Sequence, residues 1–341
     1  MDRKTFLGTT TALIGGFTIP SQKTFANSTE IISFKKPPYL KNGDIIGITA
    51  PAGSITQEEI LPALQVMQSW GYQMKVGDTI GKKDFTFGGT DEERLNDLQK
   101  MLDDPKIKAI MCARGGYGSI RIVDRVNWAR FKLHPKWIIG FSDITVLHSH
   151  IHNNFQIASI HSKMINSFPD DWSTAEPIQI ETIVSIQDAL SGKKMKYSAP
   201  PNARNRQGVT EGIITGGNLK TIETLAGSAS DIRTEGKILF VEDTGEYLYS
   251  IDRMLWNLKR TGKLTNLKAL IVGGFRVKPD DPGEEFGKTI EEIVLEKVKN
   301  YNYPVCFDFP VGHQKNNFAL KCGVKHRLSV KENEVTLSEI V

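Results

Sequence analysis

Short apolar runs alternate with longer amphipathic stretches along most of the chain. Runs at 44–49, 108–113 and 137–141 each lead into turns rich in small residues, a pattern typical of buried strands. Between the first two, apolar residues recur at helical spacing over 60–70, and Gly71 ends that pattern. Such alternation predicts an α/β fold in which helices cover both faces of a parallel sheet.

A polar, proline-containing stretch interrupts this alternation in the middle of the chain. We expect an N-terminal α/β domain over 27–168, a linker over 169–208 and a C-terminal domain over 209–341. Apolar runs predict further strands in the last of these, at 211–215, 237–241 and 267–272. The tail from 320 to 340 has the pattern of paired strands.

The first 26 residues have the pattern of an export signal. Arg3 and Lys4 precede an uncharged, mostly apolar run over 6–19, and Ala26 offers a small-residue cleavage site. Residues 2–7 also resemble a twin-arginine signal with lysine in place of the second arginine. The run is too short for a comfortable membrane span, so we expect an exported, periplasmic protein with no span in its mature chain. An uncleaved anchor or an unstructured tail is the alternative.

Composition and charge exclude several classes of protein. The 341 residues are 39% hydrophobic and 24% charged, which is ordinary for a globular protein large enough for two domains. The formal charge is only +4, without a clustered basic face, so we expect no nucleic-acid partner. The three cysteines are too few for a disulfide framework and favour buried thiols.

Ser142 lies in a G-F-S-D turn, where a predicted strand ends and a helix begins. A serine on such a turn can be a nucleophile, because N–H groups of the following helix are available to an oxyanion. Serine is also a preferred helix cap, so local sequence alone leaves capping open. The elbow motif G-x-S-x-G is absent, since Ile144 replaces its second glycine.

Two other strand ends carry candidate site residues. The glycine-rich turn 114–118 lets backbone amides approach a ligand closely, so it could serve an oxyanion, a phosphate or only a turn. It has neither Walker spacing nor a clean G-x-G-x-x-G. Glu242 ends an apolar strand, a place where acids often face the ligand crevice of α/β folds. Its neighbours Asp243 and Glu246 could take the same role, or all three could be solvated.

The histidines offer a base and a weaker metal alternative. His313 follows Gly312 in a loop, where a histidine can be structural or catalytic. His148, His150 and His152 are spaced so that the first and last share a helix face and could bind a metal. No H-E-x-x-H motif or suitable third ligand accompanies them, so we expect no metal and no cofactor.

Six ordered motifs together resemble the L,D-carboxypeptidase family of serine peptidases, which includes the microcin-immunity peptidases. They cover nearly the whole chain after the predicted signal, from about 44 to 328. The motifs are I-T-A-P-A-G at 48–53, A-R-G-G-Y-G at 113–118, I-G-F-S-D at 139–143, G-G-N-L at 216–219, L-F-V-E-D at 239–243 with I-D-R-M-L at 251–255, and G-H at 312–313 followed by Asn317 and Leu320.

The resemblance implies a role for each candidate residue. Ser142 would be the nucleophile, His313 the base and Glu242 the acid that orients the histidine. The resemblance also implies oxyanion donors, one from the N–H of Asp143 and one from Gly115 or Gly116, between which the sequence does not choose.

The resemblance further implies a β-rich core in the C-terminal domain, a homodimer and a murein-derived tetrapeptide that loses its terminal D-alanine. Because a carboxypeptidase must hold a free carboxylate, Arg114 is a candidate partner, although it could instead brace the glycine turn. One departure is Lys321 after Leu320, where the family commonly has proline.

Three rival functions stay open at this point. The chain could cleave a peptide–nucleotide amide, as microcin-immunity peptidases do, or bind wall peptides without turnover. A metal-dependent hydrolase using His148 and His152 is the third alternative.

Overall fold

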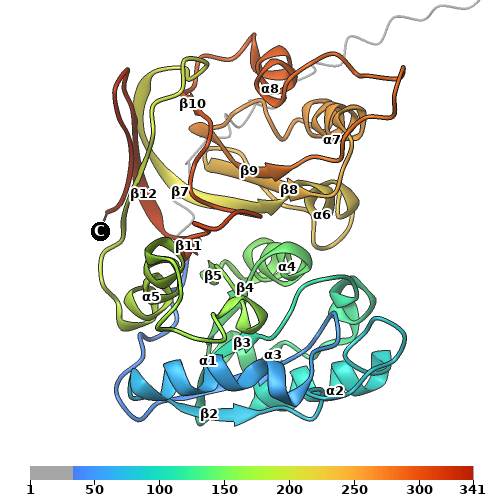
Figure 1. The fold of residues 1–341 in the computed structure, drawn as a ribbon, viewed down its shortest axis with the longest axis vertical. Helices are drawn as coiled ribbons and strands as arrows, with labels where there is room; N and C mark the ends of the chain where they lie inside the picture. The colour runs from blue at the N-terminus through green and yellow to red at the C-terminus, as the bar shows by residue number, and fades with distance from the viewer. Residues whose placement is uncertain (1–33, 341) are drawn as a thin grey trace, which may run out of the picture. The chain divides into compact units, whose positions relative to one another are not determined.

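The first of two β-sheets is built largely from the N-terminal half of the chain (Figure 1). The computed structural model describes residues 34–340, so the predicted export signal lies outside the described residues. The strand order is β11-β5-β4-β3-β1-β2, and all pairs are parallel except β11 with β5. The strands are β1 (Ile45–Thr49), β2 (Gln73–Val76), β3 (Ile107–Cys112), β4 (Trp137–Gly140), β5 (Ser159–His161) and β11 (Leu320–Cys322).

Helices cover both faces of this sheet because successive strand residues point to opposite sides. On β3, Ala109 and Met111 join a core with α1, whereas Ile110 and Cys112 join a second core with α2. The helices of this part are α1 (Gln57–Ser69), α2 (Asp91–Asp103), α3 (Ala129–Leu133) and α4 (Thr145–Phe155), with 3₁₀ turns η1 (Ser119–Arg121), η2 (Val123–Arg125), η3 (Ser142–Ile144) and η4 (Ile165–Ser167). The predicted α/β architecture is confirmed.

Capping side chains fix the residues at which helices α1 and α2 begin. Thr56 precedes α1 and Thr90 precedes α2, and each hydroxyl accepts from the backbone N–H three residues later. Glu59 and Glu93 complete the reciprocal capping boxes. The acidic first turns of both helices also complement the helix dipole.

The second sheet has seven strands in the order β10-β9-β8-β7-β12-β13-β6 (Figure 1). Strands β7 to β10 are parallel, and the remaining pairs are antiparallel. The strands are β6 (Lys196–Ala199), β7 (Gly208–Asn218), β8 (Ile238–Thr244), β9 (Ala269–Arg276), β10 (Val305–Cys306), β12 (Lys325–Val330) and β13 (Val335–Glu339). The helices are α5 (Pro177–Ser191), α6 (Leu219–Thr224), α7 (Leu248–Arg260) and α8 (Ile290–Val298).

Segments distant in the sequence connect the two sheets. Strand β11 comes from the C-terminal part of the chain but pairs with β5 of the first sheet. The stretch expected to be a linker contains α5 and β6, and β6 pairs with β13. In the tail, β12 and β13 do form the predicted strand pair, whereas β11 pairs elsewhere. Helix α4 of the first half contacts β7 and α6 of the second.

Lys321, which stands where the resembling family commonly has proline, has specific partners in the fold. Its side chain is fully buried on β11, and Nζ contacts Glu339 Oε2 at 2.9 Å and donates to the carbonyl of Lys193 at 2.8 Å. The ammonium also lies over the Tyr39 ring, 4.9 Å from its centroid. The departure therefore builds a buried ion pair between strands of the two sheets.

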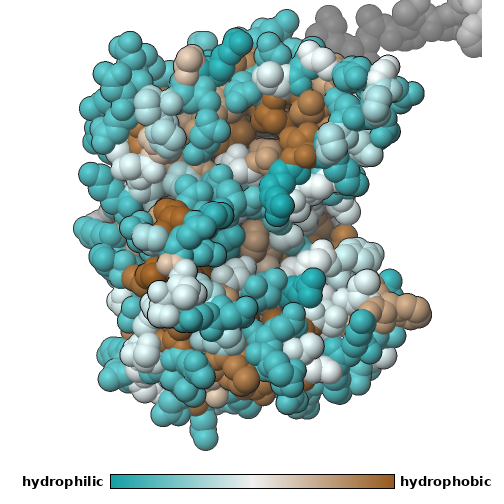
Figure 2. Space-filling view, in the orientation of Figure 1, coloured by the Kyte–Doolittle hydropathy of each residue, from teal (hydrophilic) through white to brown (hydrophobic). Residues whose placement is uncertain are grey.

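The molecular surface is mainly polar. On the face shown in Figure 2, hydrophilic side chains cover most of the area, and most visible apolar residues lie in recesses between them. All three cysteines are buried free thiols, as the composition predicted. Among residues 34–340, no helix combines the length and apolarity that crossing a membrane requires.

Candidate active site

Ser142 lies directly after β4 in a strained backbone conformation. Its φ is +61°, in the left-handed region that costs a non-glycine residue about 1–2 kcal/mol. It is the first residue of η3 rather than its cap, and within residues 34–340 its hydroxyl makes no hydrogen bond. The capping alternative is therefore not what the structure shows. Backbone strain that persists at one polar residue is typical of a functional position.

The glycine turn after β3 lies against this serine. A Cβ added to Gly115 would lie 3.3 Å from Ser142 Oγ, so the turn approaches the hydroxyl closely only because a side chain is absent. Gly116 has φ +99°, which glycine adopts readily. Within the described range, the N–H groups of Gly115, Gly116 and Asp143 have no acceptor. The three N–H groups among which the two predicted oxyanion donors would be found are thus not engaged within the fold, and their role stays a prediction.

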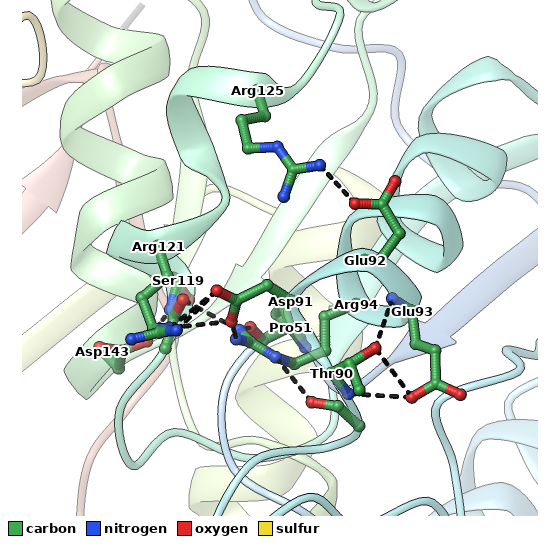
Figure 3. A network of polar contacts seen from close by, with 12 residues as sticks. Pro51, Thr90, Asp91, Glu92, Glu93, Arg94, Ser119, Arg121, Arg125 and Asp143 are labelled. Atoms are coloured by element: carbon green, nitrogen blue, oxygen red, sulfur yellow. Dashed lines mark hydrogen bonds and ion pairs between the residues drawn. The ribbon is translucent and has the colours of Figure 1, made fainter.

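Arg94, which the sequence did not single out, connects the loops around this site (Figure 3). Its side chain is fully buried, and Nη1 donates to the carbonyls of Pro51 at 2.6 Å and Gly118 at 2.9 Å. Nε donates to the carbonyl of Gly89 at 3.2 Å. One guanidinium therefore fixes three loops, and its charge is balanced by Asp91.

Asp143 anchors the serine turn to the same network (Figure 3). Its Oδ2 accepts from the N–H of Ser119 at 2.8 Å. Burial raises the pKa of Asp143, and hydrogen bonds from Ser119 with the charge of Arg94 oppose that shift. The side chain of Asp143 thus holds the turn, which leaves its backbone N–H for a ligand.

Glu242 and His313 form a close pair from two separate segments of the second half of the chain. Glu242 lies near the end of β8 with a fully buried side chain, and its Oε2 is 2.5 Å from His313 Nδ1. The His313 side chain is 15% exposed, so the ring is still accessible from one side. Because Glu242 engages Nδ1, Nε2 is the nitrogen left for proton transfer.

Gly312 permits this contact. Its φ is +102°, and an added Cβ would lie 2.4 Å from Glu242 Cβ. Its N–H donates to Asn317 Oδ1 at 2.8 Å, which fixes the loop from the other side. The contact between Glu242 and His313 therefore needs a glycine directly before the histidine, and Asn317 fixes the loop that carries both residues.

The imidazole lies next to the serine turn. The His313 ring centroid is 4.8 Å from that of Phe141, the residue before Ser142. Within residues 34–340, no hydrogen bond joins Ser142 Oγ to the ring. Such contacts are often long before substrate binds. The structure thus pairs His313 with Glu242 and places the ring beside the serine turn, while the catalytic roles stay predictions.

The two alternative acids have other partners. Asp243 accepts from Asn218 Nδ2 at 2.9 Å, and burial raises its pKa to about 6. Glu246 Oε2 accepts from Ser250 Oγ at 2.7 Å. Neither contacts His313 within the described range, so Glu242 is the acid in position to orient the imidazole.

The histidine string of α4 is engaged inside the fold. His148 Nε2 lies 2.9 Å from the carbonyl of Gly140, and His152 Nε2 lies 3.0 Å from Ser159 Oγ. Burial lowers the pKa of both residues, that of His148 to about 4. Residues 34–340 contain no group of three or more histidine, cysteine or acidic side chains placed to hold a metal ion. These contacts support a structural role for the string.

A cavity of about 980 Å³ opens beside His313. Its lining includes Phe141, the segment between β5 and α5, and two cations that the sequence did not suggest, Lys163 and Arg276. Ser142 and the glycine turn 114–118 do not belong to this lining, and Arg114 Nη1 donates to the carbonyl of Ser54 at 3.2 Å. That contact supports the alternative in which Arg114 braces the glycine turn.

Comparison with known proteins defines the class. Residues 46–162 match the LD-carboxypeptidase N-terminal domain, and residues 211–328 match the LD-carboxypeptidase C-terminal domain. Over 308 residues the chain is 31% identical to a probable murein peptide carboxypeptidase of Bacillus subtilis, covering 89% of this chain and 94% of that one. It is 29% identical over 283 residues to the murein tetrapeptide carboxypeptidase of Pseudomonas aeruginosa, covering 82% and 91%.

Solved structures agree with this assignment. The muramoyltetrapeptide carboxypeptidase from Oxalobacter formigenes has a TM-score of 0.75 at 27% identity, covering 86% of this chain and 98% of that one. MccF in complex with glutamyl sulfamoyl guanosine has a TM-score of 0.77 at 23% identity, covering 89% and 98%, and shows the shared fold alone. Fold and relatives thus define a peptidase of the carboxypeptidase type. The chain belongs to the LD-carboxypeptidase family.

Proposed function

We propose that this protein is a serine carboxypeptidase that cleaves an L,D-peptide bond and releases the terminal D-alanine of murein tetrapeptide. The observation that carries the proposal is the 2.5 Å contact of buried Glu242 Oε2 with His313 Nδ1, beside the strained turn of Ser142. The names of the Bacillus and Pseudomonas relatives support a murein peptide as substrate.

The first half-reaction forms an acyl-enzyme. Ser142 Oγ attacks the carbonyl carbon before the terminal residue, while His313 Nε2 takes the hydroxyl proton. Glu242 holds the Nδ1–H tautomer and stabilises the imidazolium. Backbone N–H groups at 115–116 and at Asp143 stabilise the oxyanion, at about 3–4 kcal/mol per donor in comparable hydrolases. Collapse breaks the C–N bond, and the imidazolium gives its proton to the leaving amine.

The second half-reaction restores the enzyme. A water molecule gives a proton to His313 and attacks the acyl ester, and the ester oxygen of Ser142 then takes that proton back. The shortened peptide leaves as a carboxylic acid. Export to the periplasm, where such wall peptides occur, is part of the proposal, and the homodimer stays a prediction.

The direct test is incubation of the purified protein with murein tetrapeptide, followed by mass spectrometry for tripeptide and free D-alanine. We expect turnover by the wild type, none above background by Ser142→Ala, and wild-type turnover by Ser191→Ala at the end of α5. Equal turnover by Ser142→Ala would remove the nucleophile from the proposal.

A fluorophosphonate probe separates the rival functions. Labelling of Ser142 without tetrapeptide cleavage would support another serine hydrolase activity, such as cleavage of a peptide–nucleotide amide. Failure to label Ser142 in a protein that still binds wall peptides would instead indicate a binding protein. Loss of activity with a chelator would indicate metal-dependent hydrolysis.

A further inference from the structure

Two cations without acidic partners line the cavity beside His313. Lys163 follows β5 of the first sheet, and Arg276 ends β9 of the second. Neither forms an ion pair with any residue in 34–340, whereas Lys315, a third cation of the lining, contacts Glu176 Oε1 at 2.6 Å. The cavity therefore presents two cationic groups that make no direct ion pair within this part of the chain, although the nearby charge of Glu242 favours the charged form of Lys163.

Lys163 is held in place by contacts that leave donors free. Its Nζ donates to the carbonyl of Gln314, the residue after His313, at 2.7 Å. The ammonium also lies 5.7 Å from the centroid of the Phe141 ring. An ammonium has three N–H donors, so two remain for a ligand. The side chain is half-buried, and keeping a partly desolvated cation unpaired costs stability unless an anion joins it.

Arg276 complements Lys163 by its exposure and its shape. It is exposed at the end of β9, and its guanidinium makes no hydrogen bond within residues 34–340. Guanidinium groups bind carboxylates through two parallel hydrogen bonds. Asp170 and Asp171 also line the cavity, and neither forms an ion pair with Lys163 or Arg276 within residues 34–340; Asp171 accepts from Ser173 N and Oγ at 2.8 and 2.7 Å. It is thus engaged within its own loop.

The position of Lys163 matches what a carboxypeptidase requires. The free carboxylate of its substrate lies one residue beyond the scissile carbonyl, within roughly 3.5 Å of chain length. His313 must reach the leaving nitrogen of that same residue. Lys163 Nζ binds the carbonyl of Gln314, the residue after His313, so this cation lies on the loop near which the terminal carboxylate must lie.

We propose that Lys163 and Arg276 bind a carboxylate of the peptide substrate. The site would then select peptides that carry a free carboxylate over the corresponding amides. This inference rests on the proposed function. The carboxylate could belong to the terminal residue or to an acidic residue on the acyl side, and both would meet the same cations. The position of Lys163 favours the terminal one.

The rival interpretation is that Lys163 only positions the loop of His313 through its contact with Gln314. Substrate chemistry separates the two interpretations. A carboxylate-binding residue discriminates a free acid from the corresponding amide, whereas a loop-positioning residue affects both substrates equally.

The experiment compares two tetrapeptides, one with a free terminal carboxylate and one with a terminal carboxamide. Each is tested on the wild type, Lys163→Met, Arg276→Gln and the control Lys315→Met. For the acid we expect kcat/KM to fall about 10- to 100-fold in Lys163→Met and about 3- to 10-fold in Arg276→Gln, with much smaller losses for the amide. Lys315→Met should leave the ratio of acid to amide unchanged.

A third peptide, with the acyl-side carboxylates amidated, identifies which carboxylate is bound. If its kcat/KM becomes insensitive to Lys163→Met, the acyl side carries the contact. Equal losses for all peptides in both variants would overturn the proposal. The exposed Arg276→Gln variant keeps the test valid if Lys163→Met folds poorly.

Binding by the Ser142→Ala variant separates this inference from the proposed function. Calorimetry with the acid and amide tetrapeptides needs no turnover. If Ser142→Ala binds the acid more tightly than the amide, and the double variant Ser142→Ala with Arg276→Gln does not, the carboxylate site is supported. This holds even if the wild type cleaves neither peptide. No difference in affinity between acid and amide would overturn it.

Discussion

Replacing Gly312 by alanine tests whether the Glu242–His313 contact depends on close backbone approach. An added Cβ would lie 2.4 Å from Glu242 Cβ, 2.7 Å from Cγ and 2.9 Å from Oε2. Carbon atoms in contact normally lie about 3.5–4.0 Å apart, so the loop or the glutamate must move by roughly 1 Å. Either movement disturbs the 2.5 Å contact of Oε2 with His313 Nδ1.

Two costs add to the effect of Gly312→Ala on stability. The φ of +102° costs a non-glycine residue about 1–2 kcal/mol, and overpacking costs about 1–3 kcal/mol. We therefore expect the free energy of unfolding to fall by about 2–5 kcal/mol. Since misplacing a catalytic group by about 1 Å can cost about 100-fold, kcat should fall by at least that factor.

The matched control is Gly262→Ala. Gly262 follows α7 with φ +76°, and an added Cβ there would meet no atom within 4 Å. This variant has the backbone strain without the overlap, so it should lose about 1 kcal/mol and no activity. The assays are urea unfolding, tetrapeptide turnover and the rate of fluorophosphonate labelling, which reports on the serine without depending on the substrate.

Near-normal turnover and labelling by a folded Gly312→Ala variant would refute this reasoning. It would mean that the loop adapts to the extra carbon without displacing the imidazole, or that the contact with Glu242 does not matter for activity. A loss of activity in Gly262→Ala equal to that in Gly312→Ala would indicate a general destabilisation.

Three further predictions concern other parts of the molecule. Glu242→Gln should lower kcat about 10³- to 10⁴-fold while the protein stays folded by circular dichroism, and unchanged turnover would exclude an orienting role. Arg94→Met should lower the free energy of unfolding in urea by about 2–4 kcal/mol, because it leaves three loop carbonyls without their buried donor while Asp91 keeps its ion pair with Arg121; a loss below about 1 kcal/mol would contradict this. Burial lowers the pKa of His326 to about 4, so the unfolded chain binds a proton below about pH 6.5 that the native state excludes, and stability is lost as pH falls from about 6.5 towards 4. His326→Gln should reduce that slope by up to about 1.4 kcal/mol per pH unit in urea titrations, and an unchanged slope would refute the assignment.

Local pattern predicted the central elements because each is long and apolar enough to show its own period. The run at 44–49 is β1 (Ile45–Thr49), and the helical spacing at 60–70 belongs to α1 (Gln57–Ser69). Strands β2 and β5 were missed. Strand β2 is a short, largely exposed edge strand, and β5 has only three residues, so neither carries a recognisable apolar period.

The sequence by itself determined which residue types stand at the strand ends, and the ordered motifs indicated the family. It could not determine that β11 pairs with β5, that Arg94 is buried among three loops, or that Lys163 meets the loop of His313. These features depend on contacts between segments that are distant in the sequence: Lys163 and Gln314 are 151 positions apart, and Arg94 and Pro51 are 43 positions apart. Periodicity and capping are interactions of near neighbours, whereas a cavity exists only after distant segments have packed together.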